Sequence, residues 1–334
     1  MSTQTSEQRR LGSSDLSVST VTLGAWALGG SMWGGQDEKH AIAAIDASLA
    51  AGVTCIDTAP IYGMGHSETL VGQALRQLRT PRQQVVIATK CGLAWDSRVG
   101  TFKFDLTDVD GSVHPVFHDL RPERVRQECE DSLRRLQVDY IDLYQVHWPE
   151  PAKPVTAALE TLAQLRNEGK IRWIGVSNFS VAQLEEASKV APVVSVQPPY
   201  NLLERGLEAA LLPWCREHAV GVIAYSPIAR GLLSGKYKPD HTFPANDHRA
   251  TVRWFQPEVR HKVDAALAQA RDMAHAHSCT LANLAAAWVI GQAGVTSAIV
   301  GARNAEQARE NARAMSVKLS QEDKDALSRT FAGI

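Results

Sequence analysis

The chain is poor in several features that mark particular classes of protein. Its five cysteines are widely spaced and contain no CxxC pair, which argues against a disulfide framework and favours a reducing compartment, the cytoplasm. No apolar run approaches the roughly 18 residues of a membrane span, and the polar start Met1–Gln8 does not resemble a signal peptide. A net charge of -1, with both signs interspersed, gives no reason to expect a nucleic-acid or membrane partner.

The sequence also contains no GxGxxG turn, which disfavours a doubly wound dinucleotide-binding domain. Instead, short apolar runs rich in β-branched residues alternate with amphipathic helical stretches, a pattern typical of βαβ units in a parallel sheet. The predicted strands are a run ending near 22–24, followed by 53–57, 85–89, 141–146, 173–176, 193–196, 220–224 and 298–300.

The connections between these elements differ in length. Helices are expected over 41–51, 121–136 and 155–167, and the links from helix to strand are short. The two long links, 91–120 and 226–257, each follow a strand, so the working face lies at the carboxyl ends of the strands. We predict an α/β fold in which residues 1–334 form a single (β/α)8 TIM barrel, with an N-terminal β-hairpin around 11–21 and long βα loops after strands three and seven.

Polar residues at the ends of successive predicted strands form a candidate catalytic set. Asp57 and Lys90 each end an apolar strand, Tyr62 lies shortly after Asp57, and His147 ends the fourth strand. Hydride addition to a carbonyl leaves an alkoxide that needs a proton. Tyr62 can supply it if the Lys90 ammonium lowers the tyrosine pKa. Asp57 would orient Lys90, and His147 would polarise the carbonyl. A structural ion pair and an ordinary core histidine are the alternatives.

Four segments carry a resemblance to a known family. They are IDTAPIYG at 56–63 with Ser67-Glu68 after it, ATK at 88–90, DYIDLYQVH at 139–147 and KIRWIGVSNF at 170–179. Together they resemble the aldo-keto reductase family, from about Leu11 to Ala314. The details are more similar to the bacterial general-stress and inositol-operon reductases and to potassium-channel β subunits than to aldose reductase.

The resemblance implies an enzyme that reduces aldehydes or ketones to alcohols with NADP(H). Asp57, Tyr62, Lys90 and His147 would be catalytic, with Tyr62 as general acid. The cofactor would be held at its carboxamide, nicotinamide ring, pyrophosphate and adenosine 2′-phosphate. The implied contacts are Trp26, Ser177, Asn178, Gln197, Tyr225, Ser226, Pro227, Ile228, Arg230, Gly231, Lys236, Gly301, Arg303, Gln307 and Asn311.

The segment expected to bind the adenosine end departs from the aldose-reductase pattern. A Lys-Ser pair is replaced by Gly301-Ala302, and an expected arginine is Gln307. Arg303 is the substitute candidate for the phosphate, so NADP(H) is favoured and NAD(H) stays open. Trp33 and Trp148 are the better candidates for an apolar carbonyl pocket, whereas Trp95, Trp254 and Phe255 are equally well explained by loop packing.

Other functions are weighed against carbonyl reduction. The chain could be a cofactor-binding regulatory subunit of a protein complex, as channel β subunits are. It could also be a lyase or isomerase that forms a Schiff base on Lys90. Gly231–Lys236 is one residue short of the P-loop motif, so binding of a nucleoside triphosphate is not expected. No metal is expected, since only His275 and Cys279 share a helix face. The expected partner is a small carbonyl compound, and the sequence defines neither its identity nor the oligomeric state.

Overall fold

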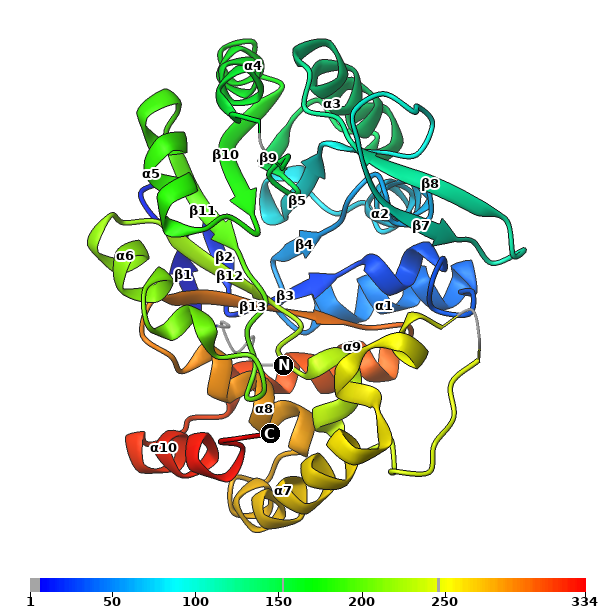
Figure 1. Cartoon of the computed structure of the whole chain (residues 1–334). Helices are drawn as coiled ribbons and strands as arrows, with labels where there is room; N and C mark the ends of the chain where they lie inside the picture. Colours follow the sequence, from blue (N-terminus) through cyan, green and yellow to red (C-terminus); the bar gives the residue numbers. More distant parts are fainter. Residues whose placement is uncertain (1–6, 152, 245–246) are drawn as a thin grey trace.

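Eight parallel strands close into a barrel in the computed structural model, which describes residues 7–151, 153–244 and 247–334 (Figure 1). Hydrogen bonds join neighbouring strands all the way around, and the last strand pairs with the first. The prediction of a TIM barrel is therefore confirmed. Its strands, in order around the barrel, are β3 (Val21–Gly24), β4 (Cys55–Asp57), β5 (Val86–Cys91), β9 (Ile141–Val146), β10 (Ile171–Ser177), β11 (Val193–Gln197), β12 (Gly221–Tyr225) and β13 (Val295–Gly301).

Helices surround this barrel, one after nearly every strand (Figure 1). Local signals define where several begin: Asp37 caps the first helix by accepting from the His40 amide, and Pro122 starts the third. The first helix begins three residues before the predicted range because of that cap. The helices are α1 (Glu38–Ala50), α2 (His66–Gln77), α3 (Pro122–Leu136), α4 (Thr156–Asn167), α5 (Val181–Val190), α6 (Leu211–Glu217), α7 (Pro257–Ala276), α8 (Leu281–Ile290), α9 (Ala305–Ala312) and α10 (Gln321–Thr330).

An antiparallel hairpin precedes the barrel, formed by β1 (Gln8–Arg10) and β2 (Ser17–Ser19). Leu11 and Leu16, in the turn between them, are buried against barrel residues such as Leu143. The hairpin thus packs against the interior of the barrel. Its strands begin slightly earlier than the predicted range, because residues 11–16 form the turn.

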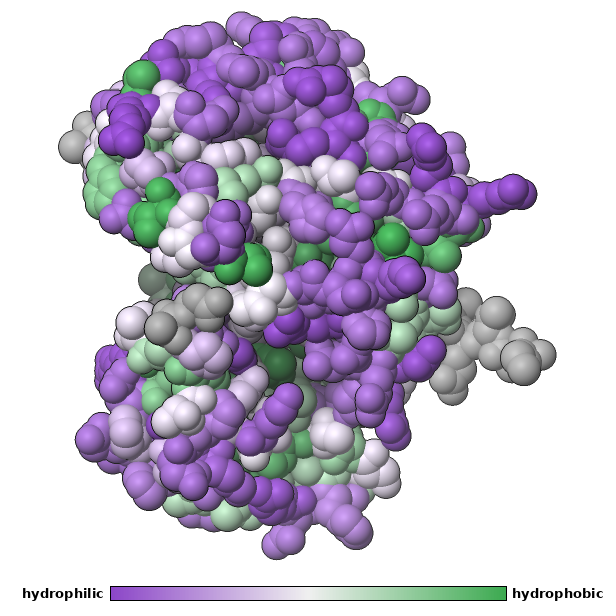
Figure 2. Space-filling view, turned by 90° about the vertical axis from the view of Figure 1, so that its right-hand side faces the viewer, coloured by the Kyte–Doolittle hydropathy of each residue, from purple (hydrophilic) through white to green (hydrophobic). Residues whose placement is uncertain are grey.

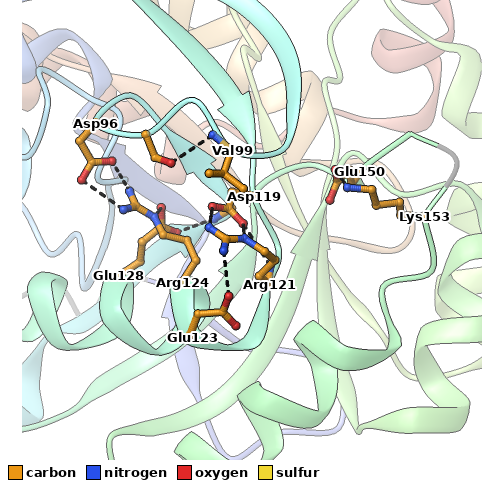
Figure 3. Close-up of polar contacts among 11 residues, drawn as sticks. Asp96, Val99, Asp119, Arg121, Glu123, Arg124, Glu128, Glu150 and Lys153 are labelled. Atoms are coloured by element: carbon orange, nitrogen blue, oxygen red, sulfur yellow. Dashed lines mark hydrogen bonds and ion pairs between the residues drawn. The ribbon is translucent and has the colours of Figure 1, made fainter.

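The loop after β5 contains a three-stranded antiparallel sheet that the sequence analysis treated only as a long loop. Its strands are β6 (Leu93–Ala94), β7 (Thr101–Thr107) and β8 (Val113–His118), and β8 lies in the middle. Arg124 of α3 ties this insertion to the barrel: it donates to Asp96 at 2.6 Å and to Glu128 at 3.0 Å (Figure 3). Glu128 also accepts the Gly92 amide at 2.6 Å. The insertion is therefore fixed over the carboxyl end of β5.

The loop after β12 folds into three short 3-10 helices, over Ala229–Ser234, His248–Thr251 and Arg253–Phe255. A bridge between Trp33 and Asp247 joins it to the loop after β3. Figure 2 shows a mostly hydrophilic surface, hollowed between its upper and lower halves. Within the described residues, no helix combines the length and the apolar character needed to cross a lipid bilayer.

Candidate active site

Lys90 lies at the centre of the polar residues around the end of β5. It has no exposed surface, and its ammonium donates to Asp57 Oδ1 at 2.7 Å, to the Thr58 carbonyl at 2.9 Å and to Tyr62 Oη at 3.3 Å. An ammonium has three donors, so all of them are used. Since Tyr62 Oη accepts from Lys90, the phenol keeps its own hydrogen for another acceptor. This full coordination also speaks against a Schiff base on Lys90.

The pKa of Tyr62 differs from what the sequence suggested. Burial raises it above the usual value, and the Asp57 charge adds to this effect. The Lys90 ammonium lowers the pKa as expected but does not outweigh burial. The inference of a net lowered pKa is therefore corrected: Tyr62 is held as the protonated phenol at neutral pH, the form that a proton donor needs.

The Asp57 carboxylate accepts hydrogen bonds from Lys90 on one oxygen and from two glutamines on the other. Burial alone would lower the pKa of Lys90, but the Asp57 charge raises it above the ordinary value. The other oxygen of Asp57 accepts from Gln197 Nε2 at 2.7 Å and from Gln145 Nε2 at 3.4 Å. The Asp57–Lys90 pair is thus buried with hydrogen bonds on both sides, which is the condition under which a buried ion pair is tolerated.

His147 follows β9 and lies beside Tyr62, with ring centroids 5.9 Å apart and planes nearly perpendicular. Burial, followed by the Lys90 and Lys103 charges, lowers the pKa of His147 well below its ordinary value. The imidazole is therefore neutral at physiological pH. A neutral imidazole offers one N–H donor, which suits a hydrogen bond to a carbonyl oxygen.

Asp57, Tyr62 and His147 all line one large cavity at the carboxyl ends of the strands, with a volume of about 1380 Å³. Lys90 lies behind the wall, in contact with Tyr62. Every cofactor contact implied by the resemblance also lines this cavity, as do the two favoured pocket tryptophans. The structure therefore brings the whole predicted set to one place.

The three residues expected to hold a carboxamide are already linked by hydrogen bonds. Ser177 Oγ donates to the Gln197 carbonyl at 2.8 Å, and Asn178 Nδ2 donates to the His147 carbonyl at 3.0 Å. Tyr225 Oη donates to Asn178 Oδ1 at 2.9 Å. Asn178 adopts a left-handed conformation with φ 64°, which asparagine tolerates better than most non-glycine residues. These contacts hold the end of β10 rigidly beside His147.

The segment after β12 has an unusual backbone. Ser226, Ala229 and Arg230 have positive φ values, as does Gly231, so the chain turns sharply around one side of the cavity. Arg230 lines the cavity, and its guanidinium lies 5.9 Å from the centre of the Trp26 ring. Among the described residues, no carboxylate forms an ion pair with Arg230; burial lowers the pKa of Arg230, and the more distant Glu204 charge only partly offsets this effect. A guanidinium without a paired carboxylate, beside a turn of this kind, suits a phosphate group.

Arg303 lines the cavity, and its guanidinium also contacts the loop after β3. Its guanidinium donates to Gln36 Oε1 at 2.9 Å, to the Trp33 carbonyl at 3.2 Å and to the Gly35 carbonyl. These acceptors are neutral, so the charge remains, but much of the hydrogen-bonding capacity is used. Arg309 and Arg313 line the same end of the cavity and were missed by the sequence analysis. Their i, i+4 spacing along and beyond α9 is the signal that could have indicated them.

Of the tryptophans, Trp33 and Trp148 line the cavity, whereas Trp95, Trp254 and Phe255 do not belong to the described residues that line it. Phe255 is buried in the core, and Trp254 packs against it. The sequence analysis also missed Lys103, from β7, and His248 and Arg249, from the loop after β12, which line the cavity. Among the described residues, no cluster of three or more His, Cys, Asp or Glu side chains could hold a metal ion.

Comparisons with known proteins agree with this geometry. The model of the aldo/keto reductase family matches residues 20–330. The chain is 39% identical to "Aldo-keto reductase YhdN" of Bacillus subtilis, over 90% of this chain and 86% of that protein. It is 38% identical to the "NADH-specific methylglyoxal reductase" of Escherichia coli, over 94% of each.

Solved structures show the same likeness. The glycerol dehydrogenase AKR11B4 of Gluconobacter oxydans is 39% identical, with a TM-score of 0.86 over 97% of this chain and 95% of that one. An aldo/keto reductase of Klebsiella pneumoniae, in complex with NADP and acetate, is 30% identical, with a TM-score of 0.71 over 98% and 95%. The chain therefore belongs to the aldo/keto reductase family and is an oxidoreductase that acts on carbonyl or CH–OH groups.

Proposed function

We propose that this protein reduces small aldehydes or ketones to alcohols with NADP(H), and that Tyr62 is the proton donor. The observation that carries the proposal is the geometry at Tyr62 Oη. This atom accepts from a fully coordinated Lys90 at 3.3 Å while Tyr62 lines the cavity. The phenol hydrogen is then available to a carbonyl oxygen bound in the cavity.

The cavity fits a nicotinamide dinucleotide. It extends from Tyr62 and His147 to α9, so it offers space for both ends of such a molecule. Asn178 and Gln197 would meet the carboxamide, and Arg230 the pyrophosphate, as proposed from the resemblance. The Klebsiella relative binds NADP and the Escherichia relative is named NADH-specific. The charges of Arg303, Arg309 and Arg313 at the adenosine end support NADP(H).

When bound, the nicotinamide supplies the hydride. Tyr62 gives its proton to the carbonyl oxygen as negative charge develops there, and the Lys90 ammonium stabilises the phenolate that remains. Asp57 keeps Lys90 charged and in place. His147, neutral, donates a hydrogen bond to the same oxygen. Reprotonation of Tyr62 completes the cycle.

Kinetics of Tyr62→Phe test the assigned proton donor. We expect kcat/KM to fall about 10²- to 10⁴-fold, the range for a lost general acid, with unchanged circular dichroism. Nucleotide binding, followed by fluorescence, should be preserved because only one hydroxyl is removed. Wild-type turnover in this variant would show that another group donates the proton. Saturation curves with NADPH and NADH would establish the cofactor preference.

We also infer that residues 1–334 form a single barrel domain. The barrel closes between β13 and β3, so neither half has a complete sheet alone, and a single cooperative unfolding transition is expected. The alternative of a regulatory subunit is not favoured, since the relatives above are named as reductases or a dehydrogenase.

A further inference from the structure

Lys103 places a positive charge in the part of the cavity nearest the catalytic residues. It lies on β7, in the insertion after β5, and lines the cavity together with Tyr62, His147 and Trp148. Its ammonium is 3.8 Å from the centre of the Trp148 ring and 3.4 Å from His118 Nε2. The Lys103 charge is the third-ranked cause, after burial and Lys90, that lowers the pKa of His147, so the ammonium lies near the catalytic residues.

This ammonium is not neutralised by a carboxylate of the protein. Within the described ranges, no Asp or Glu oxygen forms an ion pair with Lys103. Glu150, whose charge acts on the neighbouring His118, instead accepts from Lys153 at 2.5 Å (Figure 3) and from Thr101 Oγ1 at 3.0 Å. The neighbouring His118 is neutral, because burial and the Lys103 charge lower its pKa to about 4.

A partly buried ammonium without a counter-charge is unfavourable, and burial lowers the pKa of Lys103 accordingly. Apolar side chains line the same cavity, among them Ile61, Phe104 and Leu106. An anionic group bound here would regain the missing ion pair in a site of low polarity. The candidate phosphate contacts of a dinucleotide come from other segments, after β12 and β13, so Lys103 is left for the second ligand.

We propose that Lys103 is a specificity-determining residue, and that the preferred substrate is a short aldehyde or ketone carrying a carboxylate. The carbonyl oxygen would lie at Tyr62 and His147 and the carboxylate at Lys103, with the apolar wall against the chain between them. This inference rests on the proposed reductase function. It adds the charge and polarity of the substrate, which the family alone does not define.

The test compares a charged substrate with a neutral one of similar length, succinic semialdehyde and butanal. We expect wild-type protein to prefer succinic semialdehyde in kcat/KM. Lys103→Met should reduce that value about 10- to 100-fold, mainly through KM, as expected for loss of a charge-assisted hydrogen bond. Butanal has no carboxylate that could contact Lys103, so its kcat/KM should change by no more than about 2-fold. Lys103→Arg should retain the preference.

Lys238→Met is the matched control, because Lys238 pairs with Asp264 at 3.1 Å and is not one of the described cavity residues. It should leave both substrates unaffected. An equal loss for succinic semialdehyde and butanal in Lys103→Met would overturn the inference and indicate that Lys103 acts by tuning His147. So would a wild-type protein that reduces butanal at least as efficiently.

A binding measurement keeps the inference separate from the proposed reaction. Butanoate, which cannot be reduced, should quench tryptophan fluorescence in the wild-type protein, through Trp148, and should bind at least 10-fold more weakly to Lys103→Met. Equal affinities would refute a carboxylate site. Absence of turnover with every aldehyde, accompanied by Lys103-dependent butanoate binding, would instead refute the proposed reductase function alone.

Discussion

Replacing Asp57 with asparagine should damage both stability and activity, and the structure indicates why. The carboxylate receives the Lys90 ammonium at 2.7 Å and Gln197 Nε2 at 2.7 Å on its two oxygens. An asparagine has only one acceptor oxygen, so its NH2 group must face either Lys90 or Gln197, both of which are donors. One buried donor–donor contact results, and Lys90 loses its counter-charge.

The size of the effect follows from the burial of Lys90, which has no exposed surface. Breaking a buried ion pair by removing one partner costs about 3 to 5 kcal/mol, so the free energy of unfolding should fall by that amount at pH 7. The activity should fall about 10²-fold or more, because a poorly held or neutral Lys90 no longer stabilises the Tyr62 phenolate. Urea unfolding and steady-state kinetics measure the two quantities.

The pH dependence of the unfolding free energy provides the sharper test. In the wild type, Asp57 raises the pKa of Lys90 in the folded protein. The ion pair therefore contributes its full stabilisation below the pKa of an unfolded lysine, about 10.4, and loses it only as pH rises through the folded pKa. In Asp57→Asn, burial without the counter-charge lowers the folded pKa of Lys90. The variant should therefore gain stability as pH rises from this lowered folded pKa towards the unfolded value, a range in which the wild type does not gain from this group. The same pH dependence of the unfolding free energy in both proteins would refute the coupling between Asp57 and Lys90.

Two further outcomes are expected. The pH–rate profile of the reduction should show no limb near pH 6.5, because the pKa of His147 is lowered. The rate should stay constant until Tyr62 ionises, above the ordinary tyrosine pKa of about 10, because the pKa of Tyr62 is raised. A limb between pH 6 and 7 would show that His147 titrates. Gly63→Ala should lower the free energy of unfolding by at least ~1 kcal/mol. The reason is that Gly63 has φ +63° and that an added Cβ would lie 2.2 Å from the Gly29 carbonyl oxygen. Thermal unfolding indistinguishable from that of the wild type would contradict this clash.

The barrel was predictable because its strands are buried on both faces. All six residues of Ile141–Val146 are buried although Asp142 and Gln145 are polar, and the run is followed by another polar residue, His147. Once such strands are parallel, their carboxyl ends meet at one mouth. That constraint brings Asp57, Lys90 and His147 together although they are far apart in the chain.

Features that depend on contacts between distant loops were not predictable in the same way. The engagement of Arg303 by Gln36 and Gly35 joins segments more than 260 residues apart, and no local pattern indicates it. The net pKa of Tyr62 also depends on burial, which its sequence neighbours do not reveal. In contrast, the alternating segment Thr101–Phe102–Lys103–Phe104 is a strand pattern, and it could have suggested β7.

The strand ends, which were predictable, and the insertion after β5, which was not, are held in place by different kinds of contact. Reaction chemistry depends on strand ends, which the closed barrel holds in a fixed arrangement. The substrate preference proposed above depends on the insertion after β5, which is held by side-chain contacts such as those of Arg124 with Asp96 and Glu128 rather than by the barrel ladder. A substitution such as Arg124→Met should therefore weaken the Lys103-dependent preference more than it weakens the reduction of a neutral aldehyde, because the catalytic residues do not contact this network.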